Sequence, residues 1–514
     1  MLARRLRWED EIRTRLGRWL AISVVAVLVA AAFAQSTVRI GLAEDPDILD
    51  PALARTYVGR IVFASMCDKL FDIDTSAVVI PQLATGYTTS ADGLTVTIDI
   101  RSGVTFHDGT VLDAEAVKYN LDRAVNLPGS NRASELAQLE SVTVVDDDTV
   151  ELHLSTPFSP LIAQLADRAG MIVSPTAAEA AGENFGNAPV CAGPFRFVER
   201  VSQDRIVLDR FADYWQADQV LIARVVFLPI PDSSVRLANL QSGDLQMIER
   251  PAPTDLDIMR QDANLIIPST PSLGYQGITV NLSKGGPRTD PMATDARVRE
   301  AFELALDRNV INDVVFGGEY VIGNQPVPPS SPWYVTDIPI AERDLERARA
   351  LLDEAGHDRV SFEMMVANSP EGVRTGEVIQ ALVSEAGVDI TLRATEFATA
   401  LDLQEQGQYY AFPVGWSGRI DPDGNIPAFH TCEGSLNESG FCDPMVDELL
   451  DGARAAGTFD ERFDLYRQAL ERYLPDRHII YLYHTQLFFP HTTSLDGFEA
   501  YPDGLIRLLG VSLN

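Results

Sequence analysis

The stretch between residues 361 and 394 limits the possible folds more than any other, because it predicts two parallel strands. Residues 361–366 and 389–394 have the apolar pattern of strands, and a helical pattern around 378–386 separates them. A strand, a helix and a second strand in this order form a right-handed crossover between parallel neighbours in nearly all sheets. We therefore expect a sheet that is at least partly parallel.

Other segments predict antiparallel pairing and further helices. Apolar and polar residues alternate over 94–100, as in a half-buried strand, and three aspartates at 146–148 separate the runs 142–145 and 150–154 as a hairpin turn does. Asp113 can cap a helix. Further strands are expected at 37–42, 195–198, 206–208, 225–229, 245–248 and 479–483. Further helices are expected at 58–71, 234–243, 298–306, 345–355, 444–456 and 460–474. The sequence thus predicts an α/β protein of several mixed sheets.

Length and charge narrow the organisation and the partners. At 514 residues the chain exceeds one ordinary hydrophobic core, so two or three domains are expected. In α/β folds, ligands bind in clefts between domains or beyond strand ends. The formal net charge of -33 would repel nucleic acid and anionic membrane surfaces, which are therefore poor partners.

The N-terminal segment has the pattern of a secretory signal. Six arginines within residues 4–18 precede an apolar run over 19–32, and Ala32 and Ala34 occupy the small positions that a signal peptidase reads. The run is short for a membrane span. We expect residues 1–34 to be cleaved, with Gln35 as the first residue of a mature periplasmic protein. No Cys follows the small residues, so a lipid anchor is not indicated.

Export to an oxidising compartment would favour disulfides among the four cysteines. Cys432 and Cys442 enclose nine residues, and a local bridge between them is the favoured pairing. Cys67 and Cys191 are then left over and are compatible with a long-range bridge. Four cysteines allow three connectivities, so the sequence leaves this pairing open.

The stretch 409–442 has the composition of a loop that faces a ligand. An indole offers a large apolar face with one donor, glycine lets a backbone approach a bound molecule, and Arg or Asp orients an opposite charge. The alternative is a core tryptophan beside an ordinary Asp-Pro turn. The residues that carry this interpretation are Trp416, Ser417, Gly418, Arg419, Asp421 and Asp423.

The sequence lacks the common enzyme motifs. Residues 415–418 do not complete a nucleophile elbow, and no phosphate-binding loop, dinucleotide fingerprint or HExxH zinc motif is present. The seven histidines include no pair at metal-ligand spacing on one helix. We therefore expect neither catalysis nor a bound metal or cofactor.

Residues 106–121 begin with the turn Phe106-His107-Asp108-Gly109 and continue into the helix that Asp113 can cap. This pattern resembles the signature of family 5 of the extracytoplasmic solute-binding proteins, the dipeptide, oligopeptide, glutathione and nickel receptors of ABC importers. The similarity covers nearly the whole chain after residue 34. Its other motifs are Leu49-Asp50-Pro51, residues 193–197, Tyr214-Trp215, Asn281, residues 297–301 and 305–308, and Gly415-Trp416 with the loop from Cys432 to Cys442.

The resemblance implies the two-lobed fold of a type II periplasmic binding protein with an extra subdomain. Its lobes are discontinuous and are joined by two crossing strands, expected here near Asn281 and near Tyr483 and His484. Residues 35–75, 190–282 and 484–514 would form the core of lobe I. Residues 76–189 would form the inserted subdomain, and residues 283–483 would form lobe II.

The resemblance also implies where a ligand would bind. Trp416 would stack on it, and backbone groups of Ser417 and Gly418 would form hydrogen bonds with it. The candidate contacts are Arg55, Thr56, Tyr57, Tyr275, Trp416, Ser417, Gly418, Arg419, Asp421, Asp423 and His484.

Arg419 departs from the peptide-binding members of the family. Those members have an Asp three residues after the Trp, which pairs with the α-amino group of the peptide. A guanidinium at this position favours an anionic or neutral ligand, although Asp421 or Asp423 could still reach an amine. An ion pair with Asp421 or Asp423 is the alternative role of Arg419.

The resemblance predicts a periplasmic substrate-binding component of an ABC transporter, which closes two lobes around a peptide-like or other small polar organic solute. Its expected partners are this solute and the permease complex of the inner membrane, and it is expected to be monomeric. Three alternatives remain open. They are a nickel or metal-chelate receptor of the same family, a secreted hydrolase that uses Ser417 with His430 or His484, and a receptor that signals to a sensor kinase or chemoreceptor.

Overall fold

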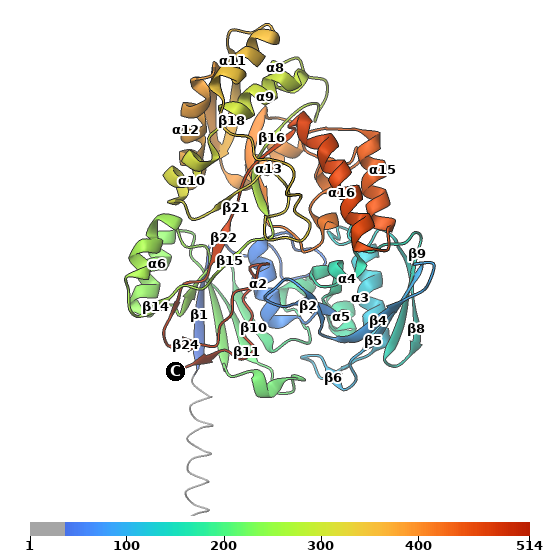
Figure 1. Cartoon of the computed structure of the whole chain (residues 1–514). Helices are drawn as coiled ribbons and strands as arrows, with labels where there is room; N and C mark the ends of the chain where they lie inside the picture. Colours follow the sequence, from blue (N-terminus) through green and yellow to red (C-terminus); the bar gives the residue numbers. More distant parts are fainter. Residues whose placement is uncertain (1–35) are drawn as a thin grey trace, which may run out of the picture.

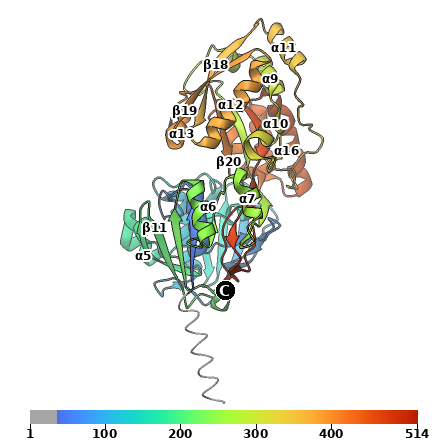
Figure 2. The ribbon, with the colours of Figure 1, turned by 90° about the vertical axis from the view of Figure 1, so that its left-hand side faces the viewer.

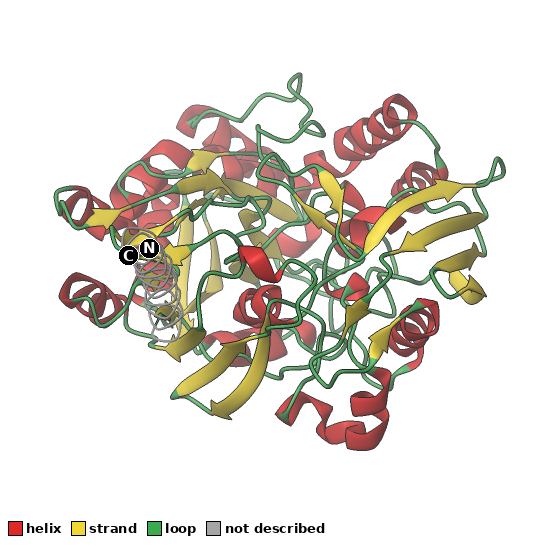
Figure 3. Cartoon of the chain, turned by 90° about the horizontal axis from the view of Figure 1, so that it is seen from below, coloured by secondary structure: helices red, strands yellow, loops and turns green. Residues whose placement is uncertain are grey.

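The structure is a computed structural model that describes residues 36–514, which form two lobes, one above the other in Figures 1 and 2. The predicted signal peptide, residues 1–34, lies outside the described residues. Helices lie beside strands throughout (Figure 3), so the α/β prediction is confirmed. No helix within residues 36–514 is long and apolar enough to cross a membrane.

The lower lobe is built on a seven-stranded mixed sheet. Strand β1 pairs in parallel with β12 and β13, whereas β11 pairs antiparallel with β12. Strands from the beginning, the middle and the end of the chain therefore share one sheet. In their order across the sheet they are β10 (Phe195–Val201), β11 (Arg205–Arg210), β12 (Arg224–Pro229), β1 (Thr37–Leu42), β13 (Met247–Ile248), β23 (His491–Thr492) and β14 (Leu265–Ile266).

Helix α2 (Tyr57–Met66) packs its apolar side on this sheet, in one core with Val38 and Ile40 of β1. The helix ends before the predicted residue 71, because Cys67 has an extended backbone and is bonded to Cys191. Other short elements of this lobe are α6 (Ser233–Ser242), α7 (Leu256–Arg260), β2 (Phe71–Ile73), β3 (Val79–Pro81), β24 (Leu495–Asp496) and β25 (Ser512–Leu513).

A second core surrounds a four-stranded antiparallel sheet on one side of the lower lobe (Figure 1). Helix α3 (Ala114–Asn126) packs on this sheet, and Asp113 caps it as predicted, accepting a hydrogen bond from the Ala116 N–H at 3.0 Å. The predicted hairpin is formed by β8 and β9. The strands, in sheet order, are β4 (Ala84–Thr89), β5 (Thr95–Ile100), β9 (Thr149–Leu154) and β8 (Leu139–Asp146). Further elements are β6 (Val104–Thr105), β7 (Val111–Leu112), α4 (Leu161–Gln164) and α5 (Pro175–Ala181).

The upper lobe is built on a six-stranded sheet. The predicted strand-helix-strand unit is confirmed, since β18 and β19 pair in parallel along their whole length and α12 connects them. The strands, in sheet order, are β17 (Val321–Ile322), β21 (Ile479–His484), β16 (Tyr275–Val280), β20 (Ala411–Trp416), β18 (Val360–Ala367) and β19 (Val388–Thr395).

Helices cover both flanks of the upper lobe. Figure 1 shows α10 and α12 on one flank and α15 and α16 on the other. The helices are α8 (Pro291–Thr294), α9 (Ala296–Ala305), α10 (Arg308–Phe316), α11 (Leu345–Glu354), α12 (Pro370–Ser384), α13 (Phe397–Glu405), α14 (Pro427–His430), α15 (Pro444–Ala455) and α16 (Phe459–Tyr473).

Two strands cross between the lobes. They are β15 (Ser269–Pro271) and β22 (Gln486–Phe488), which pair antiparallel between the two main sheets (Figure 1). Strand β16 follows β15 and already belongs to the upper sheet. The two sheets therefore divide just before Tyr275, rather than near Asn281 as the sequence suggested. Of the predicted domain boundaries, the one at residue 282 should move to this point.

Candidate ligand-binding site

The carboxyl ends of three strands of the upper sheet lie at one edge. Strands β18 and β20 are parallel, and β21 runs in the same direction because β20 and β21 are both antiparallel to β16. This edge faces the lower lobe, since β21 leads directly into the crossing strand β22. Ligands of α/β sheets bind beyond such ends. Trp416 ends β20, His484 ends β21, and Glu371 follows β18 in the first turn of α12.

Trp416 is a half-buried aromatic residue fixed at the end of β20. Its indole N–H donates to the carbonyl of Gly424 and to Oδ1 of Asn425, both at 3.0 Å. Tyr275 lies opposite Trp416 in the neighbouring strand, and its ring packs 4.7 Å from that of Tyr481. Tyr275 is buried, so its ring packs beneath the strand that carries Trp416 and supports it from inside the lobe.

The loop after Trp416 presses against the crossing segment, and glycines make this approach possible. Gly418 has a φ of 80°, and a Cβ there would lie 2.2 Å from the carbonyl carbon of Leu273. A Cβ on Gly274 would lie 1.9 Å from the carbonyl oxygen of Trp416. The exposed Ser417 accepts a hydrogen bond from Nη1 of Arg419 at 3.3 Å. The position of the loop is therefore tied to the crossing between the lobes.

Arg419 reaches from the upper lobe to the lower one. Its Nε lies 3.0 Å from Oδ2 of Asp167, and its guanidinium lies 4.6 Å from the centre of the Trp416 ring. Burial lowers the pKa of Arg419 to about 10, although Asp167 acts in the opposite direction. The predicted alternative, a local pair with Asp421 or Asp423, is wrong because both carboxylates have other arginine partners.

Asp421 and Asp423 hold the loop to the helices behind it. Asp421 accepts two hydrogen bonds from Arg462 of α16, at 2.9 and 2.7 Å. Asp423 pairs with Nε of Arg454 of α15 at 2.5 Å. Burial raises the pKa of Asp423, and Arg454 opposes this shift. Both carboxylates are engaged within the upper lobe, so the structure does not place them with the other candidate contacts.

The three candidates at the start of α2 lie on the lower lobe. The backbone N–H of Arg55 and the hydroxyl of Thr56 both donate to Asp47 at 2.8 Å, while the Arg55 side chain is exposed. The Tyr57 hydroxyl donates to the carbonyl of Asp503 at 3.3 Å. Burial raises the pKa of Tyr57 well above its ordinary value. Tyr57 thus lies on the lower lobe, and Arg55 and Thr56 shape the turn before it.

His484 is buried at the start of the crossing to β22. Its Nδ1 lies 2.7 Å from the carbonyl oxygen of Gly274, to which it donates as a neutral ring. Burial lowers the pKa of His484 to about 4, and the Gly274 carbonyl opposes this shift. His484 therefore lies at the junction of the lobes, where its ring forms a hydrogen bond with the backbone of Gly274.

Several charged residues near the site were not predicted from the sequence. The centre of the Tyr57 ring lies 5.9 Å from the guanidinium of Arg60 and 5.1 Å from that of Arg250. Asp167, the partner of Arg419, also accepts a hydrogen bond from Nε of Arg60 at 3.1 Å. Arg60 and Asp167 are buried, whereas Arg250 is exposed. A charged residue is expected on the surface, and nothing in the local sequence signals that Arg60 and Asp167 are buried.

Further polar contacts join the lobes. Arg260 forms two hydrogen bonds with Glu319, at 2.6 and 2.9 Å. The backbone N–H of Ser159 donates to the carbonyl of Arg454 at 3.0 Å. No group of three or more His, Cys, Asp or Glu residues within 36–514 could hold a metal ion.

Both disulfides are present. Cys432 is bonded to Cys442, as predicted, and Cys67 to Cys191, the long-range bridge that the sequence left open.

Two α/β lobes that meet over strand ends, with aromatic and charged side chains where they meet, are the architecture of a two-lobed solute-binding protein. The sequence profile of the bacterial extracellular solute-binding proteins, family 5 Middle, matches residues 78–437, and the chain belongs to this family. The predictions of the family and of the two-lobed type II fold are confirmed.

Known relatives match along almost the whole chain. The glutathione-binding protein GsiB of Pectobacterium atrosepticum is 30% identical over 505 residues, covering 95% of this chain and 96% of that protein. The dipeptide-binding protein of Escherichia coli is 30% identical over 532 residues, covering 96% and 98%. A dipeptide-binding protein of a Pseudoalteromonas species, solved with Met-Leu, has a TM-score of 0.84 at 21% identity, covering 93% and 100%. These relatives are binding proteins rather than enzymes.

Proposed function

We propose that the protein is the periplasmic receptor of an ABC importer and closes its lobes around a peptide-like or other small polar organic solute. The observation that carries this proposal is the contact between Arg419 of the upper lobe and Asp167 of the lower lobe, beside Trp416. Contacts that exist only when the lobes meet give a clamp its closed state. Relatives that bind glutathione and dipeptides support a solute of this size.

The solute is proposed to be anionic or neutral where it meets Arg419. Peptide-binding members have an Asp at that position, and the two nearby aspartates, Asp421 and Asp423, are already paired with Arg462 and Arg454. An ammonium group would therefore find a guanidinium and no free carboxylate in this loop.

Neither of the two main alternatives gains support from the site. A hydrolase would need a base beside Ser417, but His430 hydrogen-bonds with His478 at 2.7 Å and with Tyr481 at 2.9 Å. A receptor that binds bare nickel would need a cluster of ligands, and residues 36–514 offer no such group. The proposal is therefore a binding protein without catalytic activity.

A thermal-shift screen of the protein from Gln35 onward tests the proposal. The panel contains free and blocked dipeptides, glutathione, sugar acids and nickel chelates. A ligand at a hundred times its Kd adds about 2.7 kcal/mol to the free energy of unfolding. The shift should disappear in Trp416→Ala and persist in Trp333→Ala, which removes an indole that packs on Phe459. No shift with any compound, together with hydrolysis of an ester or amide, would refute the proposal.

A further inference from the structure

Two histidines of the upper lobe are buried against each other. His430 ends α14 and His478 directly precedes β21, and they are 0% and 1% exposed. Nδ1 of His430 lies 2.7 Å from Nε2 of His478, and Nε2 of His430 lies 2.9 Å from the Tyr481 hydroxyl. Aromatic rings stack on both imidazoles, Tyr473 at 3.9 Å from His430 and Phe441 at 4.0 Å from His478. The pair is therefore held in one geometry and shielded from solvent.

The partners of the pair indicate where its protons are. Nδ1 of His478 lies 3.5 Å from Oδ1 of Asp476, and a carboxylate only accepts, so this nitrogen is assigned the proton. Nε2 of a neutral His478 is then an acceptor, and His430 donates to it from Nδ1. Nε2 of His430 accepts in turn from the Tyr481 hydroxyl. The three contacts thus point the same way, towards Asp476, and both rings are neutral.

One more proton on the pair would reverse the contact with Tyr481. If the proton joins His430, Nε2 of that ring becomes a donor. If it joins Nε2 of His478, His430 can no longer donate to it, so the proton of His430 moves from Nδ1 to Nε2. In both cases Nε2 of His430 carries a proton, and the Tyr481 hydroxyl must turn away from it.

The surroundings of the pair offer little compensation for an added charge. Within residues 36–514, the one carboxylate within ion-pair distance of either ring is Asp476, which is already paired with Arg299 at 2.8 Å. An imidazolium would therefore be a buried charge without a partner of its own. The titratable and charged groups on the elements packed around the pair are Tyr473 of α16, Tyr275 and Tyr481 of the sheet, Asp447 of α15, Arg299 of α9, and Asp476 and Arg477 before β21.

This environment makes the pair sensitive to acid. Burial lowers the pKa of both histidines, that of His430 well below its ordinary value, while Asp476 opposes the shift at His478. The folded state thus binds fewer protons than the unfolded state. Stability is therefore lost as the pH falls below about 6.5, the ordinary pKa of histidine.

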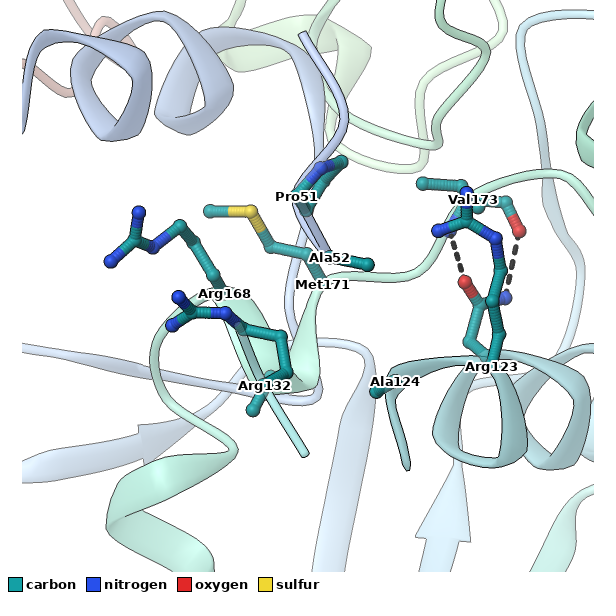
Figure 4. Close-up of a pocket in the computed structure, with 10 residues that line it drawn as sticks. Pro51, Ala52, Arg123, Ala124, Arg132, Arg168, Met171 and Val173 are labelled. Atoms are coloured by element: carbon teal, nitrogen blue, oxygen red, sulfur yellow. Dashed lines mark hydrogen bonds between the residues drawn. The ribbon is translucent and has the colours of Figure 1, made fainter. Parts of the chain in front are cut away.

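The buried arginines of the lower lobe do not respond in this way. Figure 4 shows a small cavity that Arg123, Arg132 and Arg168 line, and guanidiniums stay protonated in proteins. The described residues around this cavity include no His, Asp or Glu. A mild acidification therefore acts on the histidine pair and leaves the charges of this cavity unchanged.

Ring contacts connect the histidine pair to Trp416. Phe429 precedes His430 in α14, and its ring packs 5.2 Å from that of Trp416 and 6.2 Å from that of Tyr275. Tyr275 packs in turn 4.7 Å from Tyr481, whose hydroxyl donates to His430. A movement of α14 or of Tyr481 therefore reaches Trp416 through directly packed rings.

We propose that His430 and His478 form a proton switch beneath the loop that carries Trp416. The pair takes up one proton from the medium, Nε2 of His430 becomes a donor, and its hydrogen bond with Tyr481 is lost. Helix α14 is then displaced, and Phe429 and Trp416 move with it. The receptor is in its binding form at neutral pH and loses affinity in mild acid. Only this effect on a solute rests on the proposed function, whereas the movement of Trp416 does not.

Fluorine NMR of the protein from Gln35 onward, labelled with fluorotryptophan, tests the switch without a ligand. The Trp416 resonance is assigned by its loss in Trp416→Phe, and Trp333 is the internal reference. We expect the Trp416 resonance to shift between about pH 7 and pH 4 while that of Trp333 stays in place. The shift should be lost in His430→Gln and retained in His153→Gln, which changes a half-buried histidine of the lower lobe.

The thermal-shift panel, repeated at about pH 5, tests the consequence for binding. Compounds that stabilise the wild-type protein at neutral pH should stabilise it less in acid, and this loss should be smaller in His430→Gln. If no compound binds at either pH, the proposed function fails and the switch stands, because the fluorine signal needs no ligand.

Other outcomes would overturn the switch itself. One is a Trp416 resonance that stays in place while the wild-type protein remains folded. Another is a shift that persists in His430→Gln and disappears in His484→Asn, which would assign the titration to His484. If His430→Gln does not fold, nitrogen NMR of the wild-type imidazoles decides. His430 should be protonated at Nδ1 alone at neutral pH and gain a proton at Nε2 in acid, and a ring protonated at Nε2 from the start would contradict the proposal.

Discussion

Replacing Asp421 by Asn should destabilise the upper lobe without changing which charges the receptor prefers in its ligand. Asp421 and Arg462 are paired by two hydrogen bonds, and their side chains are only 11% and 8% exposed. Removing one partner of a buried ion pair costs about 3–5 kcal/mol. Arg462 keeps its hydrogen bond to the Ala453 carbonyl, so we expect the lower end, about 3 kcal/mol.

Denaturant unfolding followed by tryptophan fluorescence measures this cost. Trp333 is a suitable reporter, since its ring lies 5.0 Å from the Arg462 guanidinium. Asp451→Asn is the control, because that side chain is 71% exposed and should change stability by less than about 0.5 kcal/mol. The double variant Asp421→Leu with Arg462→Met should regain most of the loss, since an apolar pair leaves no charge unpaired. A cost below about 1 kcal/mol in Asp421→Asn, with selective loss of amine-bearing ligands, would refute this reasoning.

Three further predictions concern the junction of the lobes. The pKa of His484 is about 4 in the folded protein and about 6.5 when unfolded, so the folded state binds fewer protons and loses stability as the pH falls from 6.5 to 4. In His484→Asn, acid unfolding curves should be flatter by up to about 1.4 kcal/mol per pH unit. Gly274→Ala should displace the Trp416 loop and abolish ligand-induced thermal shifts, because its Cβ would overlap the Trp416 carbonyl; unchanged shifts would contradict this. Glu371 forms no ion pair or side-chain hydrogen bond within the described residues, and its exposed carboxylate near the strand ends is free for an amine. Calorimetry should show weaker binding of amine-bearing solutes in Glu371→Gln than in Glu377→Gln, which alters an exposed residue of the same helix.

Local patterns predicted the elements of this fold well and their assembly less well. The crossover between β18 and β19 follows from a short stretch of sequence, and so does the hairpin of β8 and β9. Strand β16 shows the limit. It is buried on both faces, and such a strand has no pattern that tells which sheet it joins. Its place in the upper sheet depends on pairing with β20 and β21, which follow far along the chain.

The partners of the loop charges could not be predicted for a related reason. A single sequence shows only which charges are close along the chain, so Asp421 and Asp423 were the expected ion-pair partners of Arg419. Its actual partner, Asp167, lies in the other lobe. The pairing with Asp167 instead of a neighbour in the loop changes how Arg419 would act on a ligand. Arg419 is held by Asp167, which it shares with Arg60, so it would meet a solute together with these two neighbours rather than alone.

Arg168 shows the same limit, and no motif singled it out. It follows Asp167 in the chain, and a neighbouring Asp and Arg would ordinarily be interpreted as a surface pair. Folding instead directs Asp167 to Arg60 and Arg419 and leaves Arg168 beside Arg132. Within residues 36–514, the lack of a carboxylate partner for Arg168 is therefore a property of the fold and not of the local sequence.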